Sequence, residues 1–185
     1  MNRYLLALCL AGASLGVQAG GFRVGSPEIK ANGTIGNQQV FNGFGCSGEN
    51  VSPALEWKDP PPGTKSFAVL VHDPDAPTGG SGWWHWVVIN LPAGTTGLAL
   101  GAGKADGSGL PPGSTQISTD FGSPGWGGPC PPVGDKAHRY NITVYALKVD
   151  KLDLPVGATA ALAGFMVNAN SLGKAMLTGR YGRSR

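Results

Sequence analysis

The chain has 185 residues and a formal charge of only +3 at pH 7, so it fits a single domain and lacks the basic face that nucleic-acid binding needs. Its 31 glycines and 15 prolines accompany an ordinary apolar fraction of 41%. Because the glycines and prolines punctuate apolar runs, the composition favours a loop-rich β protein over a disordered chain.

Residues 1–19 have the features of an export signal. Arg3 supplies a positive start, residues 5–17 are apolar and small, and the sequence VQA at 17–19 fits a cleavage site. The apolar run is too short for a permanent membrane-spanning helix, and no later segment is apolar enough to form one. Cleavage would leave a domain of residues 20–185, whose formal charge is one less than +3 because Arg3 is lost. We therefore expect a periplasmic or secreted protein.

Two cysteines, Cys46 and Cys130, remain after such a cleavage. An oxidising compartment would allow them to form a disulfide. The alternative is two free thiols that pack as small apolar groups. A zinc site has less support, because the cysteines are far apart and no paired Cys/His spacing accompanies them. The sequence leaves these alternatives open.

The sequence pattern predicts β-strands, weakly near the N-terminus and strongly farther along the chain. Short apolar segments near the N-terminus are weak candidates: 22–24, 29–31 and 39–41. Two core strands are predicted at 65–72 (KSFAVLVH) and 83–91 (WWHWVVINL). The segment between them, DPDAPTGGSG, is predicted to be a loop. HRYNITVYALKV at 138–149 alternates well enough to predict a third long strand.

The second half of the chain contains a long loop and a helical tail. Residues 93–132 are rich in Gly and Pro and poor in periodicity, and a loop of that length is usually functional or mobile. Residues 159–167 and 170–177 have helical composition, and Asn170 or Ser171 could cap the second helix. The sequence therefore predicts mainly β structure with one or two short helices near the C-terminus.

Acidic residues follow the first predicted core strand. Asp73 and Asp75 belong to the run DPDAP, in which each proline holds the residue before it in an extended conformation. Such a rigid loop could aim the Asp73 carboxylate into a pocket. The alternative is that both carboxylates only accept hydrogen bonds from nearby turn N–H groups.

Histidines lie near the ends of the other two predicted strands. His85 shares a strand face with Trp83, and His138 shares one with Tyr140. His85 could instead be a core residue with one satisfied hydrogen bond. The loop before His138 contains Gly128, and backbone N–H groups in Gly-rich loops can hold an anion, although an ordinary turn is the alternative. If the three strand ends converge, these residues form one small pocket.

The order of four short runs along the chain resembles the phosphatidylethanolamine-binding protein family. These runs are DPDAP, WWHWVVIN, GPCPP and HRY. Two longer segments resemble the bacterial Raf-kinase-inhibitor-like branch of this family. They are CSGENVSPALEW at 46–57 and GFMVNANSLGKAMLTGRYG at 164–182. The resemblance covers the chain from about Phe22 onward. It implies a β-sandwich with Greek-key strands and a small anion pocket at one end.

The resemblance also implies a set of ligand-binding residues. Two departures from the family pattern bear on ligand preference: Trp84 stands where relatives commonly carry a second histidine, and Cys130 stands where some carry glycine. The implied site consists of Asp73, Pro77, Trp83, His85, Gly128, Cys130, His138 and Tyr140.

The expected function is binding of phosphate, a phosphoethanolamine-type head group or a similar anion, with no cofactor or metal. Asp73 fits such a pocket if it orients a histidine and favours the imidazolium form, or if it binds an ammonium group of the ligand. In the first case anion affinity should rise on mild acidification. Some family members inhibit kinases or a protease, so the resemblance also implies that this protein could bind and inhibit a protein partner.

The alternative is a phosphoester hydrolase in which Asp73 and His85 or His138 act as acid and base. No convincing nucleophile accompanies them, because Ser81 belongs to a Gly-rich turn. A metal-dependent version would use the same residues as ligands, but they show no closely spaced ligand motif. We therefore expect a binding or inhibitor-like protein in preference to an enzyme.

Overall fold

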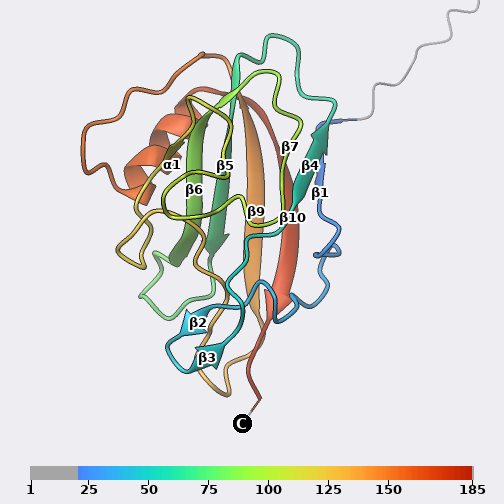
Figure 1. Cartoon of the computed structure of the whole chain (residues 1–185), viewed down its shortest axis with the longest axis vertical. Coiled ribbons are helices and arrows are strands. Elements are labelled where there is room, and N and C mark those ends of the chain that lie inside the picture. The colour runs from blue at the N-terminus through green and yellow to red at the C-terminus, as the bar shows by residue number, and fades with distance from the viewer. Residues whose placement is uncertain (1–20, 185) are drawn as a thin grey trace, which may run out of the picture.

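The computed structural model describes residues 21–184 of the chain (Figure 1). The export signal predicted for residues 1–19 lies outside the described residues.

A five-stranded antiparallel sheet forms the centre of the molecule (Figure 1). Its strands are β5 (Ser66–Asp73), β6 (Trp83–Pro92), β8 (Thr115–Gln116), β9 (His138–Leu147) and β10 (Ser171–Tyr181). They lie in the order β10-β9-β5-β6-β8. β5, β6 and β8 are successive neighbours, and β9 returns by a long connection to pair with β5. This is the Greek-key order that the family resemblance implies.

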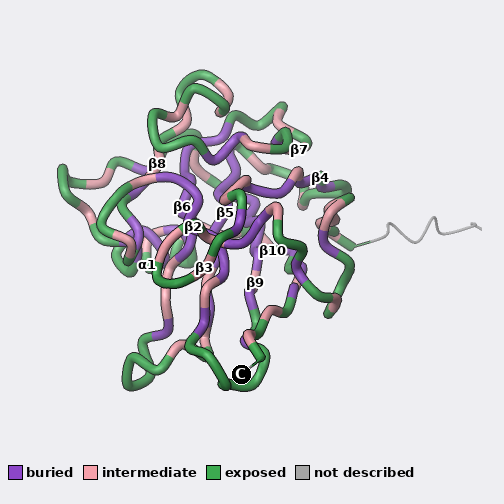
Figure 2. Tube along the Cα trace, turned by 60° about the horizontal axis from the view of Figure 1, so that its bottom comes forward, coloured by how far each residue is buried: buried purple, intermediate pink, exposed green. Residues whose placement is uncertain are grey.

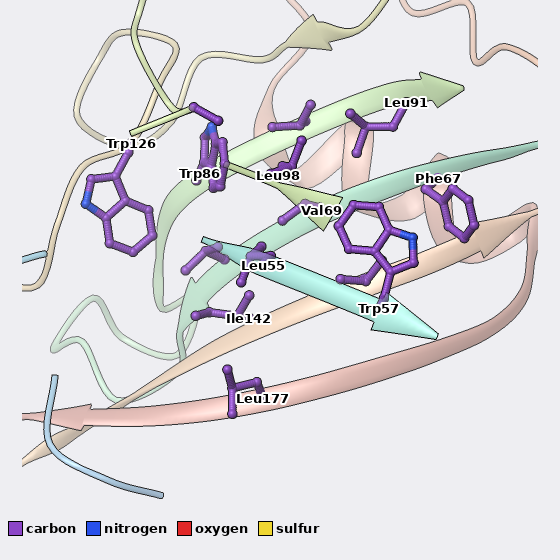
Figure 3. Packing of buried hydrophobic residues seen from close by; sticks show 14 of the residues in the cluster. Leu55, Trp57, Phe67, Val69, Trp86, Leu91, Leu98, Trp126, Ile142 and Leu177 are labelled. Atoms are coloured by element: carbon purple, nitrogen blue, oxygen red, sulfur yellow. The ribbon is translucent and has the colours of Figure 1, made fainter. Parts of the chain in front are cut away.

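A smaller sheet covers one face of the central sheet. It consists of β1 (Arg23–Gly25), β4 (Leu55–Lys58) and β7 (Gly97–Leu98). β4 buries Leu55 and Trp57 and exposes the alternate residues, because side chains alternate along a strand. Figure 3 shows Leu55 and Trp57 packed over Val69, Trp86 and Ile142 of the central strands. The two sheets and this core form a β-sandwich.

The helix α1 (Ala160–Ala169) covers the opposite face of the central sheet. Ala163 of the helix packs in one cluster with Leu70 of β5. Thr159 caps the helix, since its hydroxyl accepts a hydrogen bond from the Leu162 N–H at 3.1 Å. Because both faces are covered, β5 and β6 are buried along most of their length, as Figure 2 shows.

A short hairpin lies at the end of the central sheet where β5 ends and where β6 and β9 begin (Figure 1). It is formed by β2 (Asn42–Gly43) and β3 (Cys46–Ser47). Phe44 at its turn has a left-handed backbone conformation, with φ of 51°. A disulfide joins Cys46 to Cys130, so the structure contains the paired form of the two cysteines and not the free thiols.

The three long strands predicted from the sequence are confirmed as β5, β6 and β9, and the helix predicted at 159–167 is confirmed as α1. Of the weak candidates, 22–24 overlaps β1, whereas 29–31 and 39–41 are not strands. The sequence pattern does not predict β4, a run of only four residues.

The prediction of a second helix at 170–177 is wrong, because these residues belong to β10. Asn170 ends α1, and its N–H donates to Val167 O. Along β10, Ala175 and Leu177 are buried whereas Met176 is 60% exposed, which is the two-residue period of a strand. Pairing with β9 over nearly the whole strand overrides the helical propensity of its residues.

Candidate functional site

The end of β5 and the beginnings of β6 and β9 meet around a cavity of about 310 Å³. They meet because β5 lies between its two antiparallel partners. Asp73 is the last residue of β5, Trp83 the first of β6 and His138 the first of β9. The cavity is lined by Phe44, Asp73, Ala76, Pro77, Thr78, Trp83, His85, Phe121, Cys130, Pro131, Pro132, His138 and Tyr140.

Of the residues predicted for the site, all except Gly128 line this cavity. The Gly128 N–H donates to Asn50 Oδ1 at 2.8 Å, so it is not offered to a ligand. A Cβ added to Gly128 would lie 2.0 Å from Gln39 O. Glycine at this position therefore serves close backbone packing behind the cavity wall.

His85 reaches the cavity from a bulge in β6. Val71 of β5 pairs with Trp86. The next residue of β5, His72, pairs with Trp84, so the pairing skips His85. A bulge of this kind re-aims the side chain of the extra residue. His85 is thereby turned into the cavity wall, where it is 3% exposed.

Hydrogen bonding fixes the tautomer of His85. Its Nδ1 lies 2.6 Å from Gly127 O, and since a carbonyl oxygen only accepts, Nδ1 carries the proton and donates it. Burial lowers the pKa of His85 to about 4, and this outweighs the Gly127 carbonyl and the Asp73 charge, which favour the cation. The ring is therefore neutral at pH 7, and its Nε2 is a hydrogen-bond acceptor.

We expect the stability of the protein to fall as the pH drops from about 6.5 to about 4. The pKa of His85 is depressed from its usual 6.5 to about 4 in the folded chain, so only the unfolded chain binds the proton in this window. The contribution is fully present above pH 6.5. By pH 4 the free energy of unfolding should be lower by about 2–3 kcal/mol.

Denaturant unfolding at pH 7 and pH 4 measures this change. The variant His85→Gln has no titratable group at position 85, so it should lose that part of the pH dependence. An identical loss of stability in the wild type and in His85→Gln would assign the effect to other groups.

Asp73 and His138 form a buried pair on the cavity wall. His138 Nδ1 donates to Asp73 Oδ2 at 2.8 Å, and the two residues are 4% and 3% exposed. Asp73 Oδ1 accepts from the Asp75 N–H at 2.8 Å, so the turn hydrogen bond is present together with the histidine contact. His138 Nε2 lies 3.4 Å from Asp135 Oδ2. Asp73 thus fixes both the DPDAP loop and the orientation of the His138 ring.

Asp75 lies outside the cavity lining and pairs with Arg139. Arg139 Nη2 donates to Asp75 Oδ1 at 2.6 Å, and Arg139 Nε and N donate to Oδ2 at 2.9 and 2.8 Å. These hydrogen bonds hold the pKa of Asp75 at about 2. The pair fastens the loop after β5 to the start of β9 and keeps the Arg139 guanidinium on the outer side.

Tyr140 carries a buried hydroxyl with no hydrogen-bond partner among residues 21–184. Its ring meets the His85 ring edge-on, with 5.0 Å between centroids. Burial, and then the Asp73 charge, raise the pKa of Tyr140, so the phenol keeps its proton. An unsatisfied buried hydroxyl costs about 1–3 kcal/mol. A ligand oxygen in the cavity would supply the missing acceptor.

Two phenylalanines that the sequence analysis does not single out complete the wall. Phe121 lies edge-on to Trp83, with 5.5 Å between centroids. Phe44 stacks on Phe121 at 6.0 Å and is 69% exposed, so it lies at the rim. The disulfide ties the hairpin that carries Phe44 to Cys130 on the wall. The available sequence signal is an aromatic residue within a Gly-rich turn, which does not reveal the distant strand end that it reaches.

In the part of the chain that the structure describes, no group of three or more His, Cys, Asp or Glu side chains could hold a metal ion. No helix within residues 21–184 has the length and apolar character needed to cross a membrane.

Comparison with known proteins decides the family. The family model described as phosphatidylethanolamine-binding protein matches residues 25–182. The chain belongs to the phosphatidylethanolamine-binding protein family. This confirms the family to which the DPDAP, WWHWVVIN and HRY motifs point.

Several relatives within this phosphatidylethanolamine-binding protein family come from bacteria. The chain is 49% identical to UPF0098 protein YbcL of Escherichia coli K12 over 181 residues, 98% of each chain. It is similar to the crystal structure of YbcL with a TM-score of 0.85 and 50% identity, over 88% of this chain and 99% of that one. The putative lipoprotein LppC of Mycobacterium tuberculosis H37Rv is 38% identical over 138 residues, 75% of this chain and 63% of LppC.

Proposed function

We propose that this protein binds a small anion of the phosphate or phospho-head-group class in the cavity between β5, β6 and β9. The observation that carries the proposal is the Tyr140 hydroxyl, a buried donor without a protein acceptor on a residue of the cavity wall. Membership of a family named for binding phosphatidylethanolamine supports the same ligand class. A cavity of about 310 Å³ suits a small head group.

The lining supports this ligand class by combining a few polar groups with apolar sides. Asp73, His85, His138 and Tyr140 are the titratable groups, and aromatic and proline side chains surround them. Beside apolar side chains a hydrogen bond to a charged group is stronger than in bulk water. Asp73 does not stand as an isolated negative charge, because His138 and the Asp75 N–H both donate to it.

The variant Tyr140→Phe should bind phosphate at least about tenfold more weakly than the wild type, since a hydrogen bond to a charged group contributes about 1.5–3 kcal/mol. The free energy of unfolding of the unliganded protein should stay equal or rise by up to about 1 kcal/mol, because the variant removes an unsatisfied buried hydroxyl. Calorimetric titration with phosphate and denaturant unfolding measure the two effects.

Tyr145→Phe is the matched control. Tyr145 also lies on β9, but its ring belongs to the apolar cluster on the opposite face of the sheet, so phosphate affinity should not change. Equal affinity in the wild type and Tyr140→Phe would remove Tyr140 as the donor. A wild type that binds neither phosphate nor phosphoethanolamine at millimolar concentration would refute the proposed ligand class.

A phosphoester hydrolase is the second candidate, because the Asp73–His138 pair has the arrangement of a carboxylate that orients a histidine acid or base. An assay with p-nitrophenyl phosphate separates the two functions. Turnover that disappears in His138→Ala would favour the hydrolase. Phosphate binding without turnover would favour the binding protein. An inhibitory role toward a protein partner rests on the family resemblance alone.

We also propose that the protein acts outside the cytoplasm. Disulfides persist mainly in oxidising compartments, and Cys46 is joined to Cys130. The relative LppC is named a putative lipoprotein, which is consistent with export. Mass spectrometry of the protein from a periplasmic fraction should show a chain that begins near Gly20. Recovery of the uncleaved chain from the cytoplasm alone would contradict export.

A further inference from the structure

We infer that the cavity selects the phosphate monoanion, which carries two protons, over the phosphate dianion and over an unprotonated dianion such as sulfate. The inference rests on the proposed binding of phosphate in this cavity. It follows from the side chains of the lining, which offer more hydrogen-bond acceptors than donors, and from the charge of the lining.

Two of the lining groups are acceptors. His85 gives its Nδ1 proton to Gly127 O, which leaves the lone pair of Nε2 for a ligand. Asp73 accepts one hydrogen bond at each carboxylate oxygen, and each oxygen has a second lone pair. Sulfate has only acceptor oxygens, so it can bond neither group. A P–OH group can donate to either one.

The side-chain donors of the lining are few. Tyr140 offers its hydroxyl proton, since that hydroxyl has no partner among residues 21–184. The Thr78 hydroxyl is already engaged with Gly82 O at 3.0 Å. His138 Nδ1 is already engaged with Asp73. A ligand that brings its own proton therefore matches the cavity better than one that brings only acceptors.

The charge of the lining also disfavours a dianion. Among the described residues, the cavity lining contains no lysine and no arginine, and the Arg139 guanidinium is paired with Asp75 outside it. A dianion would meet the Asp73 carboxylate without a guanidinium or ammonium group to compensate. A monoanion halves that repulsion, and its proton converts one contact with the acceptors into a hydrogen bond.

Groups from three segments surround His85. Asp73 and His72 come from β5, Asp120 comes from the loop after β8, and Tyr140 comes from β9. Burial outweighs their charges and keeps the pKa of His85 at about 4, while the pKa of Tyr140 is raised. Neither His85 nor Tyr140 therefore changes its protonation between pH 6 and pH 8. Phosphate does, because its second proton dissociates near neutral pH.

Calorimetric titration of the wild type with phosphate and with sulfate, at pH 6 and at pH 8, tests the inference. Phosphate should bind about tenfold more weakly at pH 8, since the fraction of the monoanion falls by about that factor. Sulfate carries no proton at either pH. It should bind at least about tenfold more weakly than phosphate at pH 6, with the same affinity at both pH values.

The outcomes separate this inference from the proposed function. Equal affinity for sulfate and phosphate at pH 6 would overturn the inference and leave anion binding intact. Sulfate affinity that rises on acidification as phosphate affinity does would also overturn it, because the titrating group would then be a histidine of the protein. Absence of binding by either anion would overturn both proposals.

The variant His85→Gln tests the assigned acceptor. The glutamine amide has both an acceptor oxygen and an N–H₂ donor, so the preference for phosphate over sulfate should shrink several-fold. Tyr145→Phe, on the opposite face of the sheet, should keep the wild-type preference. An unchanged preference in a folded His85→Gln protein would remove His85 from this role. If that variant does not fold, the comparison of the two anions in the wild type decides the inference.

Discussion

Replacing Cys46 and Cys130 together by serine should lower the free energy of unfolding by about 4 kcal/mol. The disulfide joins residues 84 positions apart, and closing so long a loop restricts the unfolded chain strongly. The disulfide also fixes part of the cavity lining, because Cys130 and Phe44, a residue of the hairpin that carries Cys46, line the cavity. The double variant should therefore bind phosphate more weakly than the wild type as well. Guanidinium unfolding and calorimetric titration measure the two effects.

Wild-type protein treated with a dithiol reductant should behave like the double variant. Arg183 also joins the hairpin to the loop that carries Cys130, since it donates to Gly45 O at 3.0 Å and to Pro131 O at 2.6 Å. The hairpin should therefore loosen without detaching. The control Ser47→Ala, at an exposed position of the same hairpin, should change stability by less than about 0.5 kcal/mol. A loss below about 1 kcal/mol in the double variant would show that the disulfide is not a principal tether.

The substitution Gly128→Ala should destabilise the protein by about 3 kcal/mol. The added Cβ would lie 2.0 Å from Gln39 O and 2.6 Å from Phe41 N, which are backbone atoms that cannot rotate away. The displacement would also strain the hydrogen bond from the Gly128 N–H to Asn50. Thermal and denaturant unfolding of the purified variant measure the loss.

Gly94→Ala is the control for this substitution. A Cβ at Gly94 meets no atom within 4 Å, and Gly94 does not have a positive φ. Its stability should be unchanged or slightly higher, since alanine restricts the unfolded chain more than glycine does. If both variants kept wild-type stability, the close packing at Gly128 would not be a constraint on the loop that carries Cys130.

The sequence predicts the three long strands well because their apolar runs bury side chains on both faces and are bounded by Gly and Pro. It fails at β10, whose Leu, Lys, Ala and Met residues favour a helix locally. Pairing with β9 and burial of Ala175 and Leu177 decide the outcome there. A local pattern does not contain those contacts.

The candidate site divides in the same way. Asp73, His85 and Tyr140 can be found from the sequence because strand alternation and proline geometry place them at strand ends. Phe44 and Phe121 cannot, because each reaches the cavity from a turn whose position depends on distant contacts. The roles of individual atoms are also invisible in the sequence. Only coordinates show that the Gly128 N–H serves Asn50 and that Gly127 O fixes the His85 tautomer.

A crystal structure of the protein with phosphate at pH 6 is the most direct test of anion binding in this cavity. We predict a phosphate between the ends of β5, β6 and β9, with one oxygen at about 2.7 Å from Tyr140 Oη and another within hydrogen-bond distance of His85 Nε2. A phosphate bound only elsewhere, for example beside Arg139, with the Tyr140 hydroxyl still lacking an acceptor, would contradict the account.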